Sequence, residues 1–549
     1  MSIFSQIAGL RPGKTGFDMR HSKLFDADMG ILYPVCIMEA IPGDVFKIRA
    51  QTVIRANPLV SPILHEINAW LTFHFISNRN LMDLLPNGRG TWEDFITGGK
   101  DGDYTGGLPL LEPTNSGSFL GKHTIDDFFG MPVGQPITER NNPTRLPWMA
   151  YNFVWNEYYR DQNLQEEVDL SNRQLLRRAW KKDYFTAALP SLQRGTAPAM
   201  PVDIEFQNPL SINAVGPLTN QLGFMNWSTR NSDTGNAGGT ARVGVQYPSG
   251  ESGWRANVEN LGATPNPSGG TQGDYHLLRP VVGANSLTIP VNIDLNLGNP
   301  RVSSFDINDL RLAYQLQKWQ ERNMRAGVRL REFLLAHFGI APRDERLQRP
   351  EYIGGAKTPI IISEVLQTSS TDTTSPQGNL AGHGINLDRM RVGNYRVKEH
   401  GWILGLFNIV PRPMYSAQGV HRSFTRRTRF DFYFPEFAHL SEQAVFAKEL
   451  FSDGSEADDE VFGFQGRYNE LRVMHSQAVG NMRDLFDFWH LARKFDTHPL
   501  LNESFIQCNP DKRIFAVHNE PGFIVHFGND IQVIRPMPYI AEPGLSDHF

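Results

Sequence analysis

The chain has 549 residues, of which 40% are hydrophobic and 20% charged, so it can bury a large core. Its formal net charge of −5 excludes a uniformly basic surface for polyanions, although local basic patches remain compatible with it. The only cysteines, Cys36 and Cys508, exclude a disulfide framework and a cysteine-based metal motif, and they suit a reducing compartment.

The first segment of interest is AGLRPGKT at residues 8–15, one residue away from the G-x-x-x-x-G-K-[ST] pattern of phosphate-binding loops. A working loop of that kind follows a buried strand and opens a helix. Here only seven residues precede the segment, Pro12 removes a backbone N–H donor, and no helical apolar stripe follows. We therefore interpret the segment as a flexible basic arm that carries Arg11 and Lys14, and we reject a nucleotide-driven motor.

Strand patterns occur at both ends of the chain. Residues 43–56 and 68–77 alternate with period 2, and residues 521–538 predict a strand pair with a turn at 528–530. The residues expected on buried faces are Phe46, Ile48, Ala50, Ile54, Leu71, Phe73 and Phe75. A sheet that uses both ends of the chain needs long-range antiparallel pairing, as Greek-key and jelly-roll sandwiches do.

Two stretches between these strands show helical periodicity. In 306–338 apolar residues recur at spacings of three and four, which predicts one long helix capped by Asp306. The residues that we expect this helix to pack against the jelly roll or a neighbour are Leu316, Trp319, Leu330 and Phe333. Residues 481–495 predict a second amphipathic helix, in which His490 is interpreted as a packing residue rather than a metal ligand.

Residues 207–290 differ from their surroundings. They are rich in glycine and poor in large aliphatic residues, a composition that cannot bury much surface by itself. A strand-like pattern resumes at 281–298, so the segment is predicted to be an insertion into the host fold. We accordingly divide the chain into 1–206, with the arm and the first part of the fold, the insertion 207–290, and the remainder 291–549.

The sequence contains no organised catalytic motif. G-x-S-x-G, H-E-x-x-H, G-x-G-x-x-G and aspartate-rich calcium loops are all absent, so we predict no enzyme activity, no cofactor and no metal. No run of about 18 apolar residues and no signal-peptide core occurs, so we also expect no membrane insertion and no ordinary secretion.

Two basic clusters interleave cations with aromatic rings, at 173–182 and 421–432. Single-stranded nucleic acid suits such a pattern, because phosphates need cations and bases stack on rings. For each cluster, salt bridges across subunits or a solvated charged face remain as alternatives. With the arm, the candidate DNA contacts are Arg11, Lys14, Arg177, Arg178, Lys181, Lys182, Arg422, Arg426 and Arg427.

Several blocks in the right order resemble the major capsid protein of the Microviridae, the small icosahedral phages with circular single-stranded DNA. They include PWMAYNFVWNEYYRDQNLQ at 147–165, WKKDYFTAALPSLQRGTAP at 180–198, FDINDLRLAYQLQKWQERNMRAGVRLREFLLAHFGI at 305–340, EHGWILGLFNIVPRPMYSAQGV at 399–420 and FGFQGRYNELR at 462–472. The stretch FDMRHSK at 17–23 is similar to the family's short F-D-[LM]-S arm, with Arg20 where serine is usual. The likeness covers nearly the whole chain.

The resemblance implies a mainly β protein, an eight-stranded antiparallel jelly roll with very long inter-strand loops that contain helices. It implies a T=1 shell of about 60 copies, built through pentamers and threefold contacts. It also implies several partners: a single-stranded DNA genome, small basic DNA-binding and internal scaffolding proteins, and a host surface receptor. The expected location is the virion, assembled in the host bacterial cytoplasm.

The insertion resembles the surface protrusion of the gokushovirus branch, which the capsid protein itself builds at threefold axes. The resemblance therefore implies a role of residues 207–290 in host attachment, with isolated aromatic residues as candidates for its packing. These are Trp227, Tyr247, Trp254 and Tyr275. The alternative to a capsid protein is a non-viral carbohydrate-binding or hydrolytic jelly-roll protein.

Overall fold

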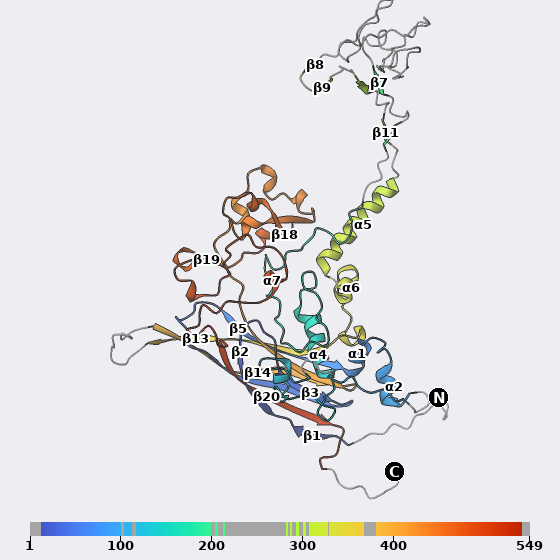
Figure 1. Cartoon of the computed structure of the whole chain (residues 1–549), viewed down its shortest axis with the longest axis vertical. Coiled ribbons are helices and arrows are strands. Elements are labelled where there is room, and N and C mark those ends of the chain that lie inside the picture. Colours follow the sequence, from blue (N-terminus) through green and yellow to red (C-terminus); the bar gives the residue numbers. More distant parts are fainter. Residues whose placement is uncertain are drawn as a thin grey trace, which may run out of the picture. The chain divides into compact units, whose positions relative to one another are not determined.

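A computed structural model describes residues 13–99, 104–111, 117–198, 307–327, 329–366 and 380–540, together with six short strands between 204 and 302. The chain forms two compact units, Met1–Ala197 with Gln317–Phe549, and Pro198–Leu316. The first unit is mainly β, with antiparallel sheets and short helices (Figure 1).

One sheet of the first unit is formed by strands from both ends of the chain. Its order is β1-β20-β4-β14-β13, and β2 pairs with β20 beside β1; every pairing is antiparallel. The strands are β1 (Thr15–Asp18), β2 (His21–Ala27), β4 (Val45–Ala56), β13 (Ile361–Leu366), β14 (Leu380–Arg396) and β20 (Phe523–Arg535). The predicted long-range pairing between the two ends of the chain is therefore confirmed.

A second antiparallel sheet has the order β12-β5-β15-β3. Its strands are β3 (Tyr33–Ala40), β5 (Ile67–Ser77), β12 (Glu351–Pro359) and β15 (Gly401–Pro411). Phe407 of β15 lies 6.0 Å from Phe25 and 5.8 Å from Phe527, measured between ring centroids, so it touches two strands of the first sheet. The main hydrophobic core thus lies between the two sheets.

The alternation predicted in the first two strands is confirmed. Phe46, Ile48, Ala50 and Ile54 are buried on β4, and Leu71, Phe73 and Phe75 are buried on β5. On β5 the other face is buried too, because helices cover it. These are α1 (Asn78–Asp83), α2 (Thr91–Thr97), α3 (Ile125–Phe128) and α4 (Leu146–Val154), followed by the π-helix Trp155–Tyr159.

The α4 helix is hydrophobic on every side, and all of its residues are buried. Pro147 occupies its first turn, where a missing backbone N–H costs nothing. Its neighbours Trp148 and Tyr151 belong to one core cluster with Ile76 and Leu406 of the second sheet. The helices therefore form a layer on the face of the second sheet that is turned away from the first sheet.

The predicted strand pair at 521–538 is wrong, because β20 is one continuous strand. Gly528, Asn529 and Asp530 do not turn; they stay paired with β4. On the other edge of β20, the partner changes here from β2 to β1. The turn-forming residues thus mark a change of neighbour, and Asn529 is buried where it donates to the carbonyl of Val35 at 3.0 Å.

The predicted single helix at 306–338 is two helices, α5 (Ile307–Ala326) and α6 (Leu330–Phe338). Gly327 breaks it with a φ of +109°, a conformation that favours glycine. The expected burial against the jelly roll of the same subunit is wrong, since Trp319 is 48% exposed and Leu330 is 58% exposed; burial against a neighbouring subunit stays a prediction. Trp319 meets Phe333 at 6.4 Å, so the stripe packs partly on itself. The predicted cap, Asp306, lies outside the described residues.

The helix predicted at 481–495 is also wrong. The segment has only two short 3₁₀ turns, Gly480–Met482 and Asp487–Trp489. His490 takes an extended conformation and is 4% exposed; its Nδ1 accepts from the N–H of Ala492, and its Nε2 donates to the carbonyl of Met482. The interpretation of His490 as a packing residue is confirmed, and its two hydrogen bonds hold the chain in a compact turn.

The remaining part of the first unit is a lobe around a short hairpin (Figure 1). The hairpin strands are β17 (Glu442–Phe446) and β18 (Val461–Gly466), and nearby elements are β16 (Tyr415–Ser416), β19 (Gln477–Ala478) and α7 (Glu503–Ile506). Its core contains Phe185, Tyr415, Val445 and Phe462. Short 3₁₀ turns, at Arg422–Phe424, Arg429–Asp431, Pro435–Phe437, Ala447–Glu449, Glu456–Asp459 and Asn469–Leu471, shape the loops around the hairpin.

The described residues of the second unit form three antiparallel strand pairs. β6 (Ile204–Phe206) pairs with β11 (Pro300–Val302), and β7 (Ile212–Ala214) pairs with β10 (Ile293–Leu295). β8 (Val282–Gly283) pairs with β9 (Ser286–Leu287). The β6–β11 pair brings the chain just before residues 207–290 next to the chain that follows them, and the β7–β10 pair continues this pairing from residues 212–214 inside the segment. The four aromatic residues predicted for the insertion, Trp227, Tyr247, Trp254 and Tyr275, lie outside the described residues.

Candidate nucleic-acid interface

The N-terminal arm does not form a phosphate-binding loop. Thr15 opens strand β1 rather than a helix, so the backbone N–H groups that follow pair with β20. Lys14 is exposed at the start of this strand, and Arg11 lies outside the described residues. Farther along, the guanidinium of Arg20 donates to the carboxylate of Asp18, with Nε 2.9 Å from Oδ1.

The cluster at 177–182 divides into structural and exposed cations. Arg177 donates to the carbonyl of Met29 at 2.9 Å, and Arg178 donates to the Asn408 side chain at 3.2 Å. These two arginines therefore hold their segment against the rest of the fold. Lys181 is exposed, with its ammonium 5.2 Å from the centre of the Trp70 ring. The side chain of Lys182 is 54% exposed and pairs with Asp161.

The cluster at 422–427 divides in a similar way. Arg422 pairs with Glu449 at 3.5 Å, and Arg426 pairs with Glu470 at 3.2 Å. Both carboxylates are buried, and burial raises the pKa of Glu449 although Arg422 opposes this shift. Arg422 and Arg426 thus compensate buried charges within the subunit, whereas Arg427 is exposed.

Only the start of one further surface was located from the sequence, inside the cluster at 421–432, and a second one was missed. The first is the aromatic–arginine segment, residues 424–440, with exposed side chains at Phe424, Phe430, Phe432, Tyr433, Phe434 and Leu440. The second is the acidic loop, residues 453–460, which holds five acidic residues in eight positions. A run of aromatic letters and a run of acidic letters are the signals that could have found them, whereas the basic residues alone do not reveal either surface.

The acidic loop has a fixed conformation. Asp458 accepts hydrogen bonds from Ser452 Oγ at 2.7 Å and from the N–H of Gly454 at 3.1 Å. His498 Nε2 lies 2.8 Å from the same carboxylate, and this bond contributes most to lowering the pKa of Asp458 to about 2. Asp453, Asp458 and His498 lie close enough to hold a cation. In this structure the His498–Asp458 bond closes the loop, which leaves the outer acids exposed.

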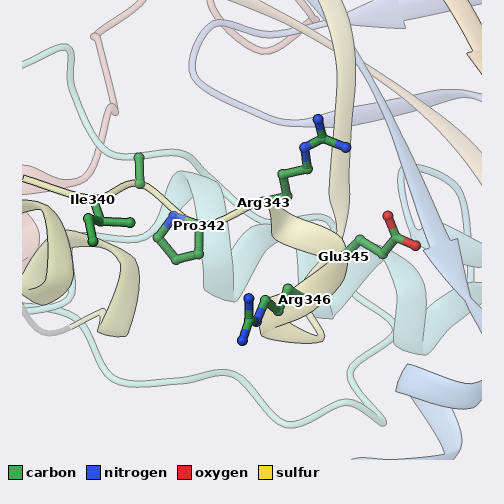
Figure 2. Close-up of a pocket in the computed structure, with 6 residues that line it drawn as sticks. Ile340, Pro342, Arg343, Glu345 and Arg346 are labelled. Atoms are coloured by element: carbon green, nitrogen blue, oxygen red, sulfur yellow. The ribbon is translucent and has the colours of Figure 1, made fainter.

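A hollow of about 490 Å³ between α6 and β12 does not resemble an active site. It is lined by a single stretch between α6 and β12: Ile340, Ala341, Pro342, Arg343, Glu345 and Arg346. Figure 2 shows that Arg343, Glu345 and Arg346 point in different directions rather than toward a common centre. A catalytic set needs a nucleophile, a base and an orienting group that converge, and these residues do not.

Strongly shifted histidine and cysteine pKa values in this fold result from burial. Burial lowers the pKa of His74 to about 3, between the rings of Tyr158 and Tyr352, and burial raises the pKa of Cys36 and Cys508 to about 12. His74 is therefore neutral in the folded chain. Below about pH 6.5 the unfolded chain binds a proton that the folded chain does not, so stability falls as the pH falls. These groups belong to the packed interior and not to a reactive cleft.

Two stacked antiparallel sheets, long loops and charged and aromatic surfaces define a structural protein that works through its surfaces. Among the residues that the structure describes, no helix is long and apolar enough to cross a membrane. The chain belongs to the phage family described as Capsid protein (F protein), whose pattern matches residues 5–545. It is thus a structural component of a virion and not an enzyme, as predicted.

Curated relatives agree over their whole length. The chain is 33% identical to Capsid protein VP1 of Chlamydia phage 1 over 609 aligned positions, which cover 99% of this chain and 97% of the relative. It is 32% identical to Capsid protein VP1 of Bdellovibrio phage phiMH2K, with 100% and 98% covered. It is 27% identical to Capsid protein VP1 of Spiroplasma virus 4, with 99% and 97% covered. The predicted resemblance to the major capsid proteins of this phage group is confirmed, and the non-viral alternative is excluded.

Proposed function

We propose that the chain folds as an eight-stranded jelly roll and assembles into a T=1 icosahedral shell around circular single-stranded DNA. The observation that supports the fold is the strand order. The eight main strands, in chain order, are β2, β3, β4, β5, β12, β14, β15 and β20. The first sheet contains the first, eighth, third and sixth of these strands, which are neighbours in that order. The second sheet contains the second, seventh, fourth and fifth. This winding between two sheets supports the proposed jelly roll, because viral jelly rolls connect eight strands across two sheets in the same way.

Membership of a capsid family supports self-assembly. The long connections between strands support a large contact area between subunits. One connection, between β5 and β12, runs from residue 78 to residue 350, and another, between β15 and β20, runs from 412 to 522. Loops of this length extend the contact area of a subunit beyond its sandwich. Identical subunits that close with icosahedral symmetry give about 60 copies, with contacts at fivefold and threefold axes.

We expect the purified full-length chain to form uniform isometric particles. Electron microscopy shows their size, and the mass of the particle gives the number of copies. Particles of about 60 subunits support the proposed shell. A chain that stays monomeric, or forms sheets or tubes instead, contradicts it.

The proposed inner contact with DNA rests on the exposed cations of the arm and of the 177–182 cluster. Lys14 and Lys181 are exposed. Arg11 is the remaining candidate of the arm. Arg177 and Arg178 would contribute through the position that they give to Lys181 and Lys182, because their own guanidinium groups already donate within the fold. Small basic viral proteins would share the condensation of the genome.

Replacing Lys14 and Lys181 together with alanine is expected to lower genome retention while shells still form. Removing one phosphate contact should reduce the salt dependence of binding, by about 0.7 in the slope of log K against log salt for single strands. The measurement is the DNA-to-protein ratio of purified particles over a salt series. The matched control is Lys122→Ala, which removes an exposed lysine outside the clusters. Equal DNA retention in both variants would exclude these two lysines.

We further propose that residues 207–290 form a protrusion that contributes to host attachment. The support is the glycine-rich composition of the segment and the pairing of β6 with β11, which joins the chain on either side of it, followed by the pairing of β7 with β10 at its base. A projecting loop on a scaffold is a common place for recognition. Three copies around a threefold axis would allow the aromatic residues of the segment to pack together.

A further inference from the structure

Two oppositely charged surfaces lie at the two ends of the β17–β18 hairpin. Glu442 pairs with Gly466 at one end of the hairpin, and Phe446 pairs with Val461 at the other. The acidic loop connects the strands at the Phe446 end. The aromatic–arginine segment leads into β17 and packs against residues 468–470, at the Glu442 end. The five-residue strand β17 spans about 17 Å between these two ends. The chain that precedes the segment starts nearer the loop end, where Arg422 pairs with Glu449.

The aromatic–arginine segment is exposed yet held in place. The side chain of Phe424 is 83% exposed, and five further apolar side chains of the segment are 41–53% exposed. Tyr468 Oη donates to the carbonyl of Phe432 at 3.1 Å, and Asp431 accepts from the N–H groups of Arg427 and Thr428. Exposed large apolar side chains that gather within one short segment are typical of interaction sites. Because it is already ordered, binding costs little conformational entropy.

The composition of this segment favours a protein partner over DNA. The rings already carry cations, since the guanidinium of Arg429 lies 4.8 Å from the Phe430 ring and that of Arg426 lies 5.6 Å from the Phe432 ring. Faces covered in this way are less available for stacking on bases. Phenylalanine, tyrosine and arginine are, however, the residues that interfaces between proteins accumulate.

The acidic loop has the complementary chemistry. Asp453, Glu456, Asp459 and Glu460 are exposed on it, and Lys448 pairs with Asp459. At the other end of the hairpin, Arg427, Arg429 and Arg472 are exposed. Asp431 and Glu436 offset only part of this positive charge. One rigid element thus presents a basic aromatic surface at one end and an acidic surface at the other.

We propose that the aromatic–arginine segment of one subunit binds the acidic loop of a second copy of this chain. The inference rests on the proposed self-assembly and names the surfaces that carry one of its contacts. Because each copy offers both surfaces, the contact is head to tail, and repetition around a rotation axis closes it into a ring. Arg427 and Arg429 meet Glu456 and Glu460 across the contact, and Phe424 inserts beside them.

Charge reversal tests this contact. Arg427→Glu with Arg429→Glu places like charges against the acidic loop, and Glu456→Arg with Glu460→Arg places them against the segment. We expect each double variant to lower the particle yield at least about tenfold, because like charges at an interface are strongly unfavourable. Combining all four changes restores opposite charges, and the yield should return to within about threefold of the original chain.

A second four-residue variant tests whether the positions of the charges matter or only the net charge of the chain. Arg427→Glu with Arg429→Glu is joined to Glu93→Arg and Glu139→Arg, two exposed acids elsewhere on the subunit. The net charge is then the same as in the four-residue swap, but we expect no rescue. Phe424→Ser is an independent variant whose side chain is too exposed to affect folding, and it should also lower the yield. Thermal unfolding of unassembled subunits checks that every variant is folded.

Three outcomes overturn the inference. In the first, both charge reversals assemble as well as the original chain. In the second, the four-residue swap assembles no better than either half. In the third, Arg427→Glu with Arg429→Glu gives a normal number of particles with less DNA, which assigns the segment to the genome. If the unchanged chain itself forms no closed particles, the proposed shell fails instead of this contact.

Discussion

Replacing Asp126 with alanine is expected to lower the free energy of unfolding of the subunit by about 3–5 kcal/mol and to prevent shell formation. The Asp126 carboxylate is completely buried, and Arg173 is 4% exposed. Arg173 Nε lies 3.2 and 3.1 Å from the two carboxylate oxygens. The carboxylate also accepts from Trp148 Nε1 at 2.8 Å and from the N–H of Leu120 at 2.8 Å.

The size of this effect comes from what the alanine leaves behind. Without Asp126, the Arg173 charge stays in the interior without its counter-ion, and Trp148 and Leu120 each lose an acceptor. The network joins α3, α4 and the loop before α3, so the helical layer over the second sheet loses its central connection.

Denaturant unfolding of unassembled subunits measures the change. The control is Lys398→Met, which removes an ion pair with Glu345 whose side chains are 63% and 39% exposed. That change should alter stability by no more than about 1 kcal/mol. If Asp126→Ala unfolds at the same denaturant concentration as the control, the buried pair does not stabilise the fold.

Deleting residues 235–270 is expected to leave shell formation largely intact and to reduce adsorption to host cells at least about tenfold. In the proposed shell about 60 copies would attach together, so weakening the receptor binding of every copy should have a multiplied effect on avidity. Assembly should survive because the strand pairs β6–β11 and β7–β10 lie outside the deleted residues. The fraction of virions that remain free after mixing with cells measures adsorption.

A matched variant replaces residues 235–270 with a glycine–serine stretch of the same length. This variant distinguishes an effect of the segment's sequence from an effect of its length. Virions that carry it should adsorb to cells as poorly as virions with the deletion. Loss of shells in the deletion would assign the segment to the framework of the capsid. Unchanged adsorption in both variants would place the receptor contact elsewhere on the virion.

Strands were predictable where one face is buried and the other is not. The alternation in β4 gave the correct face because only one layer packs on it. Residues Gly528 to Asp530 were wrongly predicted to form a turn, because the residue types typical of turns also occur here, where β20 changes its neighbouring strand. Which of these occurs depends on β1, β2 and β4, some 500 residues away in sequence, and no local pattern contains that information.

Helices in the long connections were less predictable. Apolar periodicity correctly located α5 and α6, but it did not reveal that Trp319 remains half exposed, because exposure depends on which neighbour arrives. In 481–495 the same periodicity predicted a helix, but the chain instead forms a compact turn held by hydrogen bonds to His490. Side chain to backbone hydrogen bonds there compete with the helical ladder, and spacing alone does not detect them.

The basic clusters can be found in the sequence, but the sequence does not predict which of their cations pair within the subunit and which stay exposed. Arg422 and Arg426 lie in the same run as Arg427, and only the fold places buried glutamates beside the first two. The acidic loop was missed for a related reason. A run of acidic residues does not by itself predict an interaction surface. Only the fold of the hairpin places this run at the end opposite the basic surface.

The position of β20 has a consequence for how the chain is made. This strand, at residues 523–535, lies between β4 on one edge and β1 and β2 on the other. During translation, the ribosome has added more than 500 residues before this central strand exists. Until then β1 and β2 lack the neighbour that the finished sheet gives them, and the sandwich cannot close. We therefore expect chains that end before residue 523 to stay out of shells, since β20, the last strand in the described part of the chain, completes the fold that assembly requires.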